Sequence, residues 1–125
     1  MNLKNLTPHA VRIRLDGEAR AEPLPYDLVI PPEPIQARVA THSVVVGHVL
    51  GIPVIVSVRG RIEDLPEPAL GVAYIVLLIV LDALRAQGST RRDVFAPATG
   101  PSDGAIRTKD GQIFAVTRLV GLGAP

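Results

Sequence analysis

Hydrophobic and polar residues alternate along much of the chain, a pattern that predicts β-strands. The first such segment is AVRIRL, residues 10–15, which places its aliphatic side chains, including Leu15, on one face and Arg12 and Arg14 on the other. An Asp-Gly pair, favoured in tight hairpins, follows at 16–17. We therefore predict a half-buried strand that keeps its two arginines in solvent and runs into a turn.

Similar patterns predict further strands along the chain. Residues 22–34 are rich in proline, which removes backbone donors, so we expect an extended surface loop with at most a short strand at DLVI. In PVIVSVRG, Val54, Val56 and Val58 should share an inward face. The other strands are expected at residues 35–41, 93–97 and 112–120, with a hairpin turn at Asp110-Gly111.

One long apolar run, ALGVAYIVLLIVL at residues 69–81, changes character half-way. Its first part is β-branched and aromatic, whereas LLIVLDALRAQG is rich in helix formers and ends in glycine. We predict a buried strand that passes directly into a helix at about residues 77–87. The run is shorter than the ~20 residues that a membrane-spanning helix needs, so we interpret it as core.

Together these elements predict one α+β domain over residues 1–125, a mainly antiparallel β-sheet with one clear helix. A chain of 125 residues has the length of one domain, and no internal repeat or linker divides it.

Charge and composition narrow the function. With 13 basic against 12 acidic residues, nothing favours a nucleic-acid polymer or a membrane surface as partner. The absence of cysteine fits a reducing cytoplasm. The three histidines are scattered, no GxSxG motif occurs, and adjacent acids such as Glu63 and Asp64 are expected to be solvated. We therefore expect no metal, no cofactor and no catalytic site.

The segment RRDVFAPATGPSDGAIRTKDG, residues 91–111, is the best candidate for an anion site. Arginine beside an irregular loop with available N–H groups suits phosphate. Phe95 or Phe114 offers a face for a base, and the scarcity of aromatic residues favours one small nucleotide over a polymer. In an alternative interpretation, Arg91 and Arg92 pair with Asp93 or cap the preceding helix.

A set of motifs in one order spans nearly the whole chain: NLTPHAV, ARV, GIPV, LPEP, YIV, RRDVFAP and IRTKDGQI. This order resembles a family of small phage and prophage proteins, the first type of Thoeris anti-defence protein. Its members sequester cyclic ADP-ribose signals made by TIR-domain enzymes, and in some cases cyclic oligonucleotides.

The resemblance implies a protein of the host cytoplasm that binds a cyclic nucleotide without cleaving it. It also implies a pocket formed between the protomers of a homodimer that can assemble further into a hexamer. Carried over by position, the implied ligand-binding residues are Arg38, Arg92, Asp93, Phe95 and Arg107. Arg38 and Arg107 would neutralise phosphates, Asp93 would accept from a ribose hydroxyl or orient Arg92, and Phe95 would stack on adenine.

The chain departs from the family pattern in three places. Leu77 stands where members carry a serine that caps the helix. Thr108-Lys109 replaces an acidic turn, and the proline-rich stretch before Pro34 is longer than expected. Two other functions stay open: a structural or protein-interaction module that uses exposed β-edges, and a nucleotide-cleaving enzyme.

Overall fold

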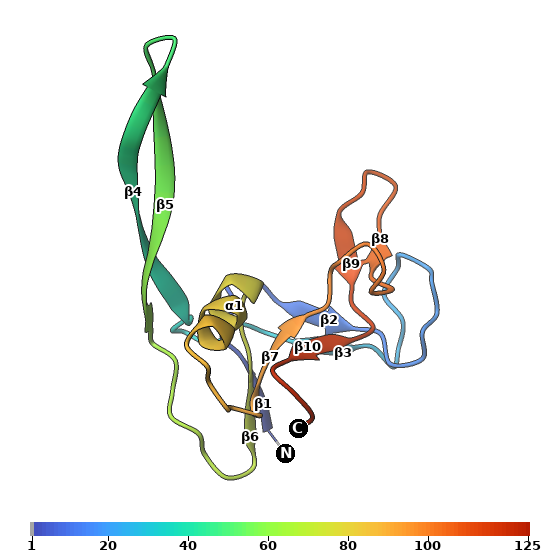
Figure 1. Ribbon diagram of the computed structural model, residues 1–125. Coiled ribbons are helices and arrows are strands. Elements are labelled where there is room, and N and C mark those ends of the chain that lie inside the picture. Colours follow the sequence, from blue (N-terminus) through green and yellow to red (C-terminus); the bar gives the residue numbers. More distant parts are fainter. Residues whose placement is uncertain (1) are drawn as a thin grey trace.

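The apolar run forms the centre of the fold (Figure 1). A computed structural model describes residues 2–125. Strand β6 (Val72–Ile75) passes through two residues into helix α1 (Leu78–Ala86), close to the predicted bounds. Within residues 2–125, no helix is long and apolar enough to cross a membrane.

The predicted class, a mainly β α+β fold with one helix, is confirmed, and its central sheet is mixed. The sheet has the order β1-β6-β7-β10, formed by β1 (Asn2–Asn5), β6, β7 (Val94–Pro97) and β10 (Leu119–Gly121). Both β1 and β7 run parallel to β6, and β10 is antiparallel to β7. The β6–β7 pair is parallel because the chain crosses over through α1 between these two strands.

The two faces of this sheet have different covers. Tyr74, Val94 and Ala96 point to the face on which α1 packs, where the helix buries Val80 and Leu84. The opposite face is covered in part by a ribbon of β2 (Val11–Ile13) and β3 (Leu28–Ile30), and the buried residues there are Val11, Ile13, Ile75 and Val116.

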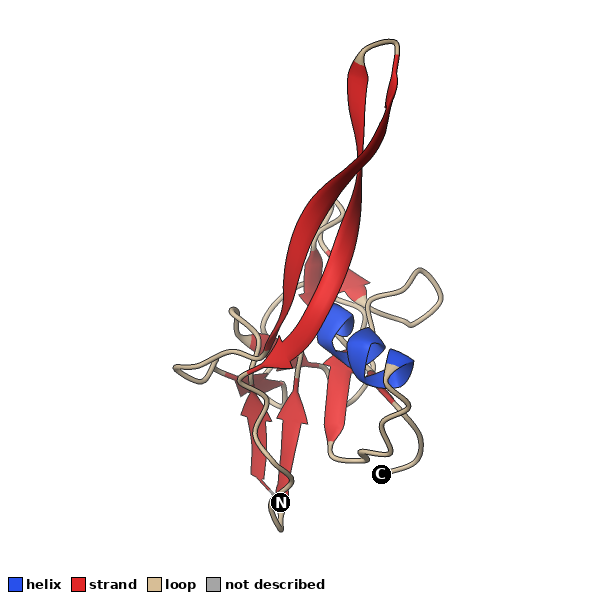
Figure 2. Cartoon of the chain, turned by 60° about the vertical axis from the view of Figure 1, so that its left-hand side comes forward, coloured by secondary structure: helices blue, strands red, loops and turns tan. Residues whose placement is uncertain are grey.

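The pair β4 (Arg38–Val49) and β5 (Ile52–Glu63) forms a long antiparallel hairpin, here called the arm, that stands away from the body (Figures 1 and 2). Its base packs on the core beside α1 through Val39 and Ile62. Strands were predicted at residues 35–41 and 53–60, so β5 was largely expected, whereas residues 42–49 of β4 were not. The prediction that Val54, Val56 and Val58 face inward is wrong. They share a face that is exposed, because alternation specifies an apolar face and not what covers it.

The predicted turn at Asp110-Gly111 is present, between β8 (Ile106–Arg107) and β9 (Ile113–Ala115). The predicted strand at 112–120 is divided into β9 and β10. Strand β9 stops pairing with β8 after Ala115, because the next residue, Val116, bonds to the main chain of the β2 region. The Val116 carbonyl accepts from the Arg14 amide at 2.8 Å, and the Val116 amide donates to the Arg12 carbonyl at 2.9 Å.

The structure corrects the expected exposure of Arg14. Its side chain is 1% exposed, whereas Leu15 is 67% exposed. Asp16-Gly17 does not close a two-residue hairpin, since β2 pairs with β3 across a long loop. The Arg14 guanidinium pairs with Asp27 and donates to three carbonyls of this loop, those of Glu18, Arg20 and Glu22. A guanidinium offers five N–H donors, enough to replace the backbone partners that an irregular loop lacks.

Helix α1 begins without a side-chain cap. Leu77 occupies the N-cap position and makes no capping hydrogen bond, because its aliphatic side chain has no acceptor. The C-terminal end is closed by main-chain bonds, from the Gln87 amide to the Ala83 carbonyl and from the Gly88 amide to the Arg85 carbonyl.

The ionisation of Asp27 should make the free energy of unfolding depend on pH in the acidic range. The hydrogen bond from Arg14 lowers the pKa of Asp27 to about 2, below its unfolded value of about 3.9. Because the folded pKa is the lower one, its stabilising contribution is present above pH ~4 and is lost as pH falls from ~4 to ~2. Thermal unfolding of the wild type and Asp27→Asn across this range should show a steeper decline for the wild type.

Glu67→Gln, which removes an exposed carboxylate, is the matched control and should keep the wild-type slope. Equal slopes for the wild type and Asp27→Asn would contradict the assignment.

Candidate functional site

Among the clefts within residues 2–125, two lie against opposite faces of the central sheet. The first, here called the Tyr74 cleft, lies on the helix side and has a volume of about 460 Å³. It is bordered by Lys4, Leu6, Glu33, Pro34, Ile35, Asp64, Leu65, Pro66 and Tyr74. Its lining has two carboxylates and one ammonium group, so its net negative charge disfavours an anion such as phosphate.

Arg38 lies at the rim of the Tyr74 cleft with its charge already paired. It opens β4, and its guanidinium is 3.0 Å from a carboxylate oxygen of Glu63 and 3.3 Å from one of Asp64. The side chain is 62% exposed, so these ion pairs are weak and a ligand can displace them at small cost.

Asp93 lies near the same cleft and holds Arg91 in place. The Arg91 guanidinium donates two bonds to the carboxylate, of 3.0 and 2.8 Å, and a third of 2.9 Å to the Pro66 carbonyl. It also lies 6.0 Å from the centre of the Tyr74 ring. The hydrogen bonds from Arg91 lower the pKa of Asp93, which stays ionised near neutral pH.

The family resemblance implied that Asp93 accepts from a ribose hydroxyl or orients Arg92, and a pairing of Arg91 and Arg92 with Asp93 was the alternative. The structure has the Arg91 pairing. The two residues lie in an irregular segment ahead of β7, where sequence spacing does not fix the direction of a side chain.

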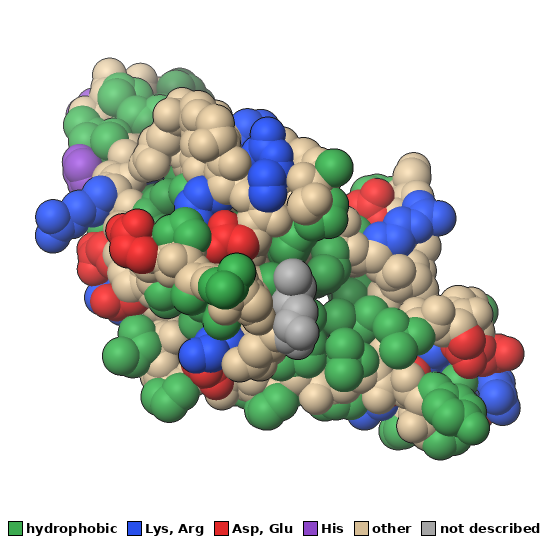
Figure 3. Space-filling view, turned by 90° about the horizontal axis from the view of Figure 1, so that it is seen from below, with side chains coloured by type: hydrophobic (Ala, Val, Ile, Leu, Met, Phe, Trp, Pro, Cys, Tyr) green, Lys and Arg blue, Asp and Glu red, His purple; other side chains and the backbone are tan. Residues whose placement is uncertain are grey.

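The second cleft, here called the Phe95 cleft, lies on the opposite face of the sheet and is apolar. Its volume is about 620 Å³, and it is lined by Leu3, Leu28, Ala73, Phe95, Leu119, Gly121, Gly123 and Pro125. Seen from below, hydrophobic side chains gather in the centre of this side of the molecule (Figure 3). The cleft exists because the β2–β3 ribbon covers only part of this face.

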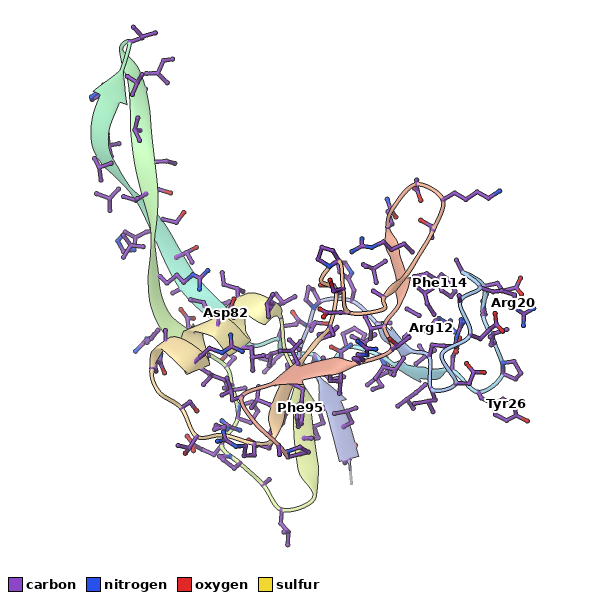
Figure 4. All side chains as sticks on the ribbon, turned by 45° about the vertical axis from the view of Figure 1, so that its right-hand side comes forward. Arg12, Arg20, Tyr26, Asp82, Phe95 and Phe114 are labelled. Carbon is purple, nitrogen blue, oxygen red and sulfur yellow. The ribbon has the colours of Figure 1, made fainter. Side chains whose placement is uncertain are left out.

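Phe95 is held in the cleft by a close approach to β10. A Cβ added to Gly121, its register partner, would lie 3.1 Å from the Phe95 ring, so the ring rests on bare backbone. Figure 4 shows Phe95 under the sheet and Phe114 on another side of the molecule, beside Arg12. The Arg12 guanidinium lies 5.2 Å from the Phe114 ring centre, so one face of that ring is already covered.

Arg92 lies at the edge of the Phe95 cleft. A Cβ added to Gly123 would lie 2.8 Å from its Nε atom, which places the guanidinium over the chain end that lines the cleft. The guanidinium donates one bond of 3.2 Å, to the Arg91 carbonyl. No carboxylate within residues 2–125 forms an ion pair with it, so most of its donors face solvent.

Arg107 lies apart from both clefts, in the β8–β9 hairpin on the side of the body away from the arm (Figure 1). Its exposed guanidinium donates to the carbonyls of Gly111 at 3.1 Å and Thr99 at 2.9 Å. In the part of the chain that the structure describes, no acid pairs with it.

Within one chain, the five expected ligand residues therefore lie in three separate places. Arg38 and Asp93 are near the Tyr74 cleft, Arg92 and Phe95 are at the Phe95 cleft, and Arg107 is in the β8–β9 hairpin.

No protein-family model, curated protein or solved structure matches this chain. The family named by the motif order stays a prediction. Over residues 2–125, no group of three His, Asp or Glu side chains could hold a metal ion.

The Arg91–Asp93 pair should contribute measurably to stability. The two side chains are 17% and 20% exposed and share two hydrogen bonds, so Asp93→Asn should lower the free energy of unfolding by about 1 kcal/mol, the upper end for such pairs. Asp82→Asn breaks the more exposed pair with Arg85 and should cost at most about 0.5 kcal/mol. Equal losses in urea unfolding would contradict this ranking.

Proposed function

We propose that this chain binds a small cyclic nucleotide, such as a cyclic ADP-ribose isomer or a cyclic oligonucleotide, and sequesters it without cleaving it. The observation that carries the proposal is the Phe95 cleft, where an aromatic ring and an arginine without an acidic partner border one open apolar cavity. The anti-defence role comes from the resemblance in motif order. The cleft adds an aromatic ring on which a base can stack and an arginine that can bind phosphate.

The cleft suits a nucleotide on physical grounds. Its volume of about 620 Å³ falls within the range of small-molecule sites. A base stacked on Phe95 would leave its phosphates at the rim, where Arg92 can donate charge-assisted hydrogen bonds.

Binding without cleavage is supported by the cleft lining. All of its residues are aliphatic, aromatic, glycine or proline. Hydrolysis needs a positioned acid or base to activate water, and none of these side chains can do so.

The remaining arginines support a pocket completed by another protomer. Arg38 and Arg107 lie apart from Phe95 within one chain, yet both guanidiniums are exposed. A homodimer, or a hexamer built from it, would bring Arg107 of one copy to the Phe95 cleft of another.

A protein-interaction module is the second candidate function. It is favoured by the arm, whose two strands have open edges and exposed apolar side chains.

Calorimetric titration with cyclic ADP-ribose isomers and cyclic dinucleotides tests the proposal. One of these should bind tightly, and heat denaturation followed by chromatography should return it intact. Arg92→Ala removes charge-assisted bonds worth about 1.5–3 kcal/mol and should weaken binding about 10- to 100-fold. Phe95→Leu and Arg107→Ala should also weaken it.

Arg85→Ala is the control, because this exposed helix arginine lies away from the cleft lining and pairs with Asp82. Cleaved products in place of the ligand would indicate an enzyme. If no nucleotide gives heat, nucleotide binding is contradicted and the protein-interaction module becomes the favoured function.

A further inference from the structure

The arm exposes one mainly apolar face, which also contains His42 opposite Val58 and Gly47 opposite Val54. The register of the hairpin places Val44 opposite Val56 and Val49 opposite Ile52, and Val54 and Val58 follow on the same side because alternate residues of a strand share a face. These six side chains are between 39% and 63% exposed. The other face is more polar, with Ser43 opposite Ser57, although Val45 opposite Ile55 is exposed on it as well.

The tip of the arm is a second unusual feature. Leu50 and Gly51 form the turn, and both have positive φ, 51° and 77°. Asn, Asp or Gly is favoured at the first of these positions, because a larger side chain is strained there. Leu50 is instead a leucine that is 96% exposed. A partner that covers the tip would bury the exposed side chain of Leu50.

A two-stranded ribbon of this kind is only marginally stable in water. Neither strand pairs with a third strand within residues 2–125, and only the base touches the core. An exposed apolar face and tip of this kind are typical of an interaction surface.

We propose that the partner is a second copy of this chain, and that two copies embrace with the apolar face of each arm lying along the body of the other copy. This inference specifies the surface of the self-association in the proposed function. It rests on that self-association and not on the identity of the ligand.

Surface area favours a second copy. A ribbon of 12 residues and two strands is about 40 Å long and about 10 Å wide, so its face covers about 400 Å². Docked on an unrelated protein, it buries only about half of the ~800 Å² per partner that a stable interface needs. In a two-fold embrace, each copy contributes its own arm and the surface under the partner's arm, which together reach about 800 Å².

Charge also favours self-contact. Residues 39–58 contain no Asp, Glu, Lys or Arg. A two-fold interface repeats each contact on both copies, so an arm without charged side chains buries no unpaired charge in either half of it.

The composition of the arm argues against a lipid surface. Residues 38–63 contain no Trp, Tyr or Phe, the aromatic side chains that anchor a segment at the membrane interface. The open strand edges would also lack hydrogen-bond partners in lipid.

Sedimentation velocity of the purified full chain at micromolar concentration tests the inference. The wild type should sediment as a dimer or a multiple of it. Val56→Lys places a charge on the apolar face and should weaken association at least 100-fold, giving a monomer. Ser57→Lys adds the same charge to the neighbouring exposed residue on the other face and should leave the assembly intact.

Leu50→Asn is a second variant, which suits the positive φ and keeps the fold. It should weaken association by about tenfold while leaving the circular dichroism spectrum unchanged. A monomeric wild type, including one that floats with phosphatidylcholine vesicles, would overturn the inference. So would unchanged assembly of both Val56→Lys and Leu50→Asn.

The two proposals fail separately. A dimer that ignores both arm variants but binds nucleotide would refute the arm inference alone. Arm-dependent dimers that give no heat with any nucleotide would refute the ligand alone.

Discussion

The parallel crossover from β6 through α1 to β7 is the constraint on which the rest of the structure depends. It buries a continuous set of aliphatic side chains, among them Val76, Val80 and Val94, none of which has exposed surface. It also fixes the loop that precedes β7, so that Arg91, Arg92 and Asp93 enter the sheet at a defined edge. The arm packs its base on the same helix.

The crossover leaves the two sheet faces unequal. One helix is enough to cover the face that contains Tyr74, whereas a short ribbon covers only part of the other. That ribbon depends on Arg14, whose pKa is raised chiefly by its hydrogen bond to Asp27 and whose donors organise the long loop between its strands. The uncovered remainder of the sheet face is the Phe95 cleft.

Much of the fold could be predicted from the sequence. The change from β-branched residues to helix formers at residue 77 located the strand-to-helix passage, and the Asp110-Gly111 pair located a turn. The burial of Arg14 could not be predicted, because alternation in AVRIRL assigns it to the same side as Arg12. The partner that buries it, Asp27, is 13 residues away in a loop without periodicity.

The candidate site was less predictable. The residues of segment 91–111 were identified, but a linear pattern gives no distances between them. The Arg91 guanidinium pairs with the Asp93 carboxylate, and the Arg92 side chain lies instead against the chain end at Gly123. The bare backbone of Gly121 that supports Phe95 becomes visible only through the pairing of β7 with β10.

The most direct test is a crystal structure of the full chain with cyclic ADP-ribose. We expect the adenine on Phe95, a phosphate at Arg92 with Arg107 supplied by another copy, and each arm lying along a second protomer. A nucleotide seated elsewhere, such as in the Tyr74 cleft, would contradict the central claim that the uncovered face of the sheet is the ligand site.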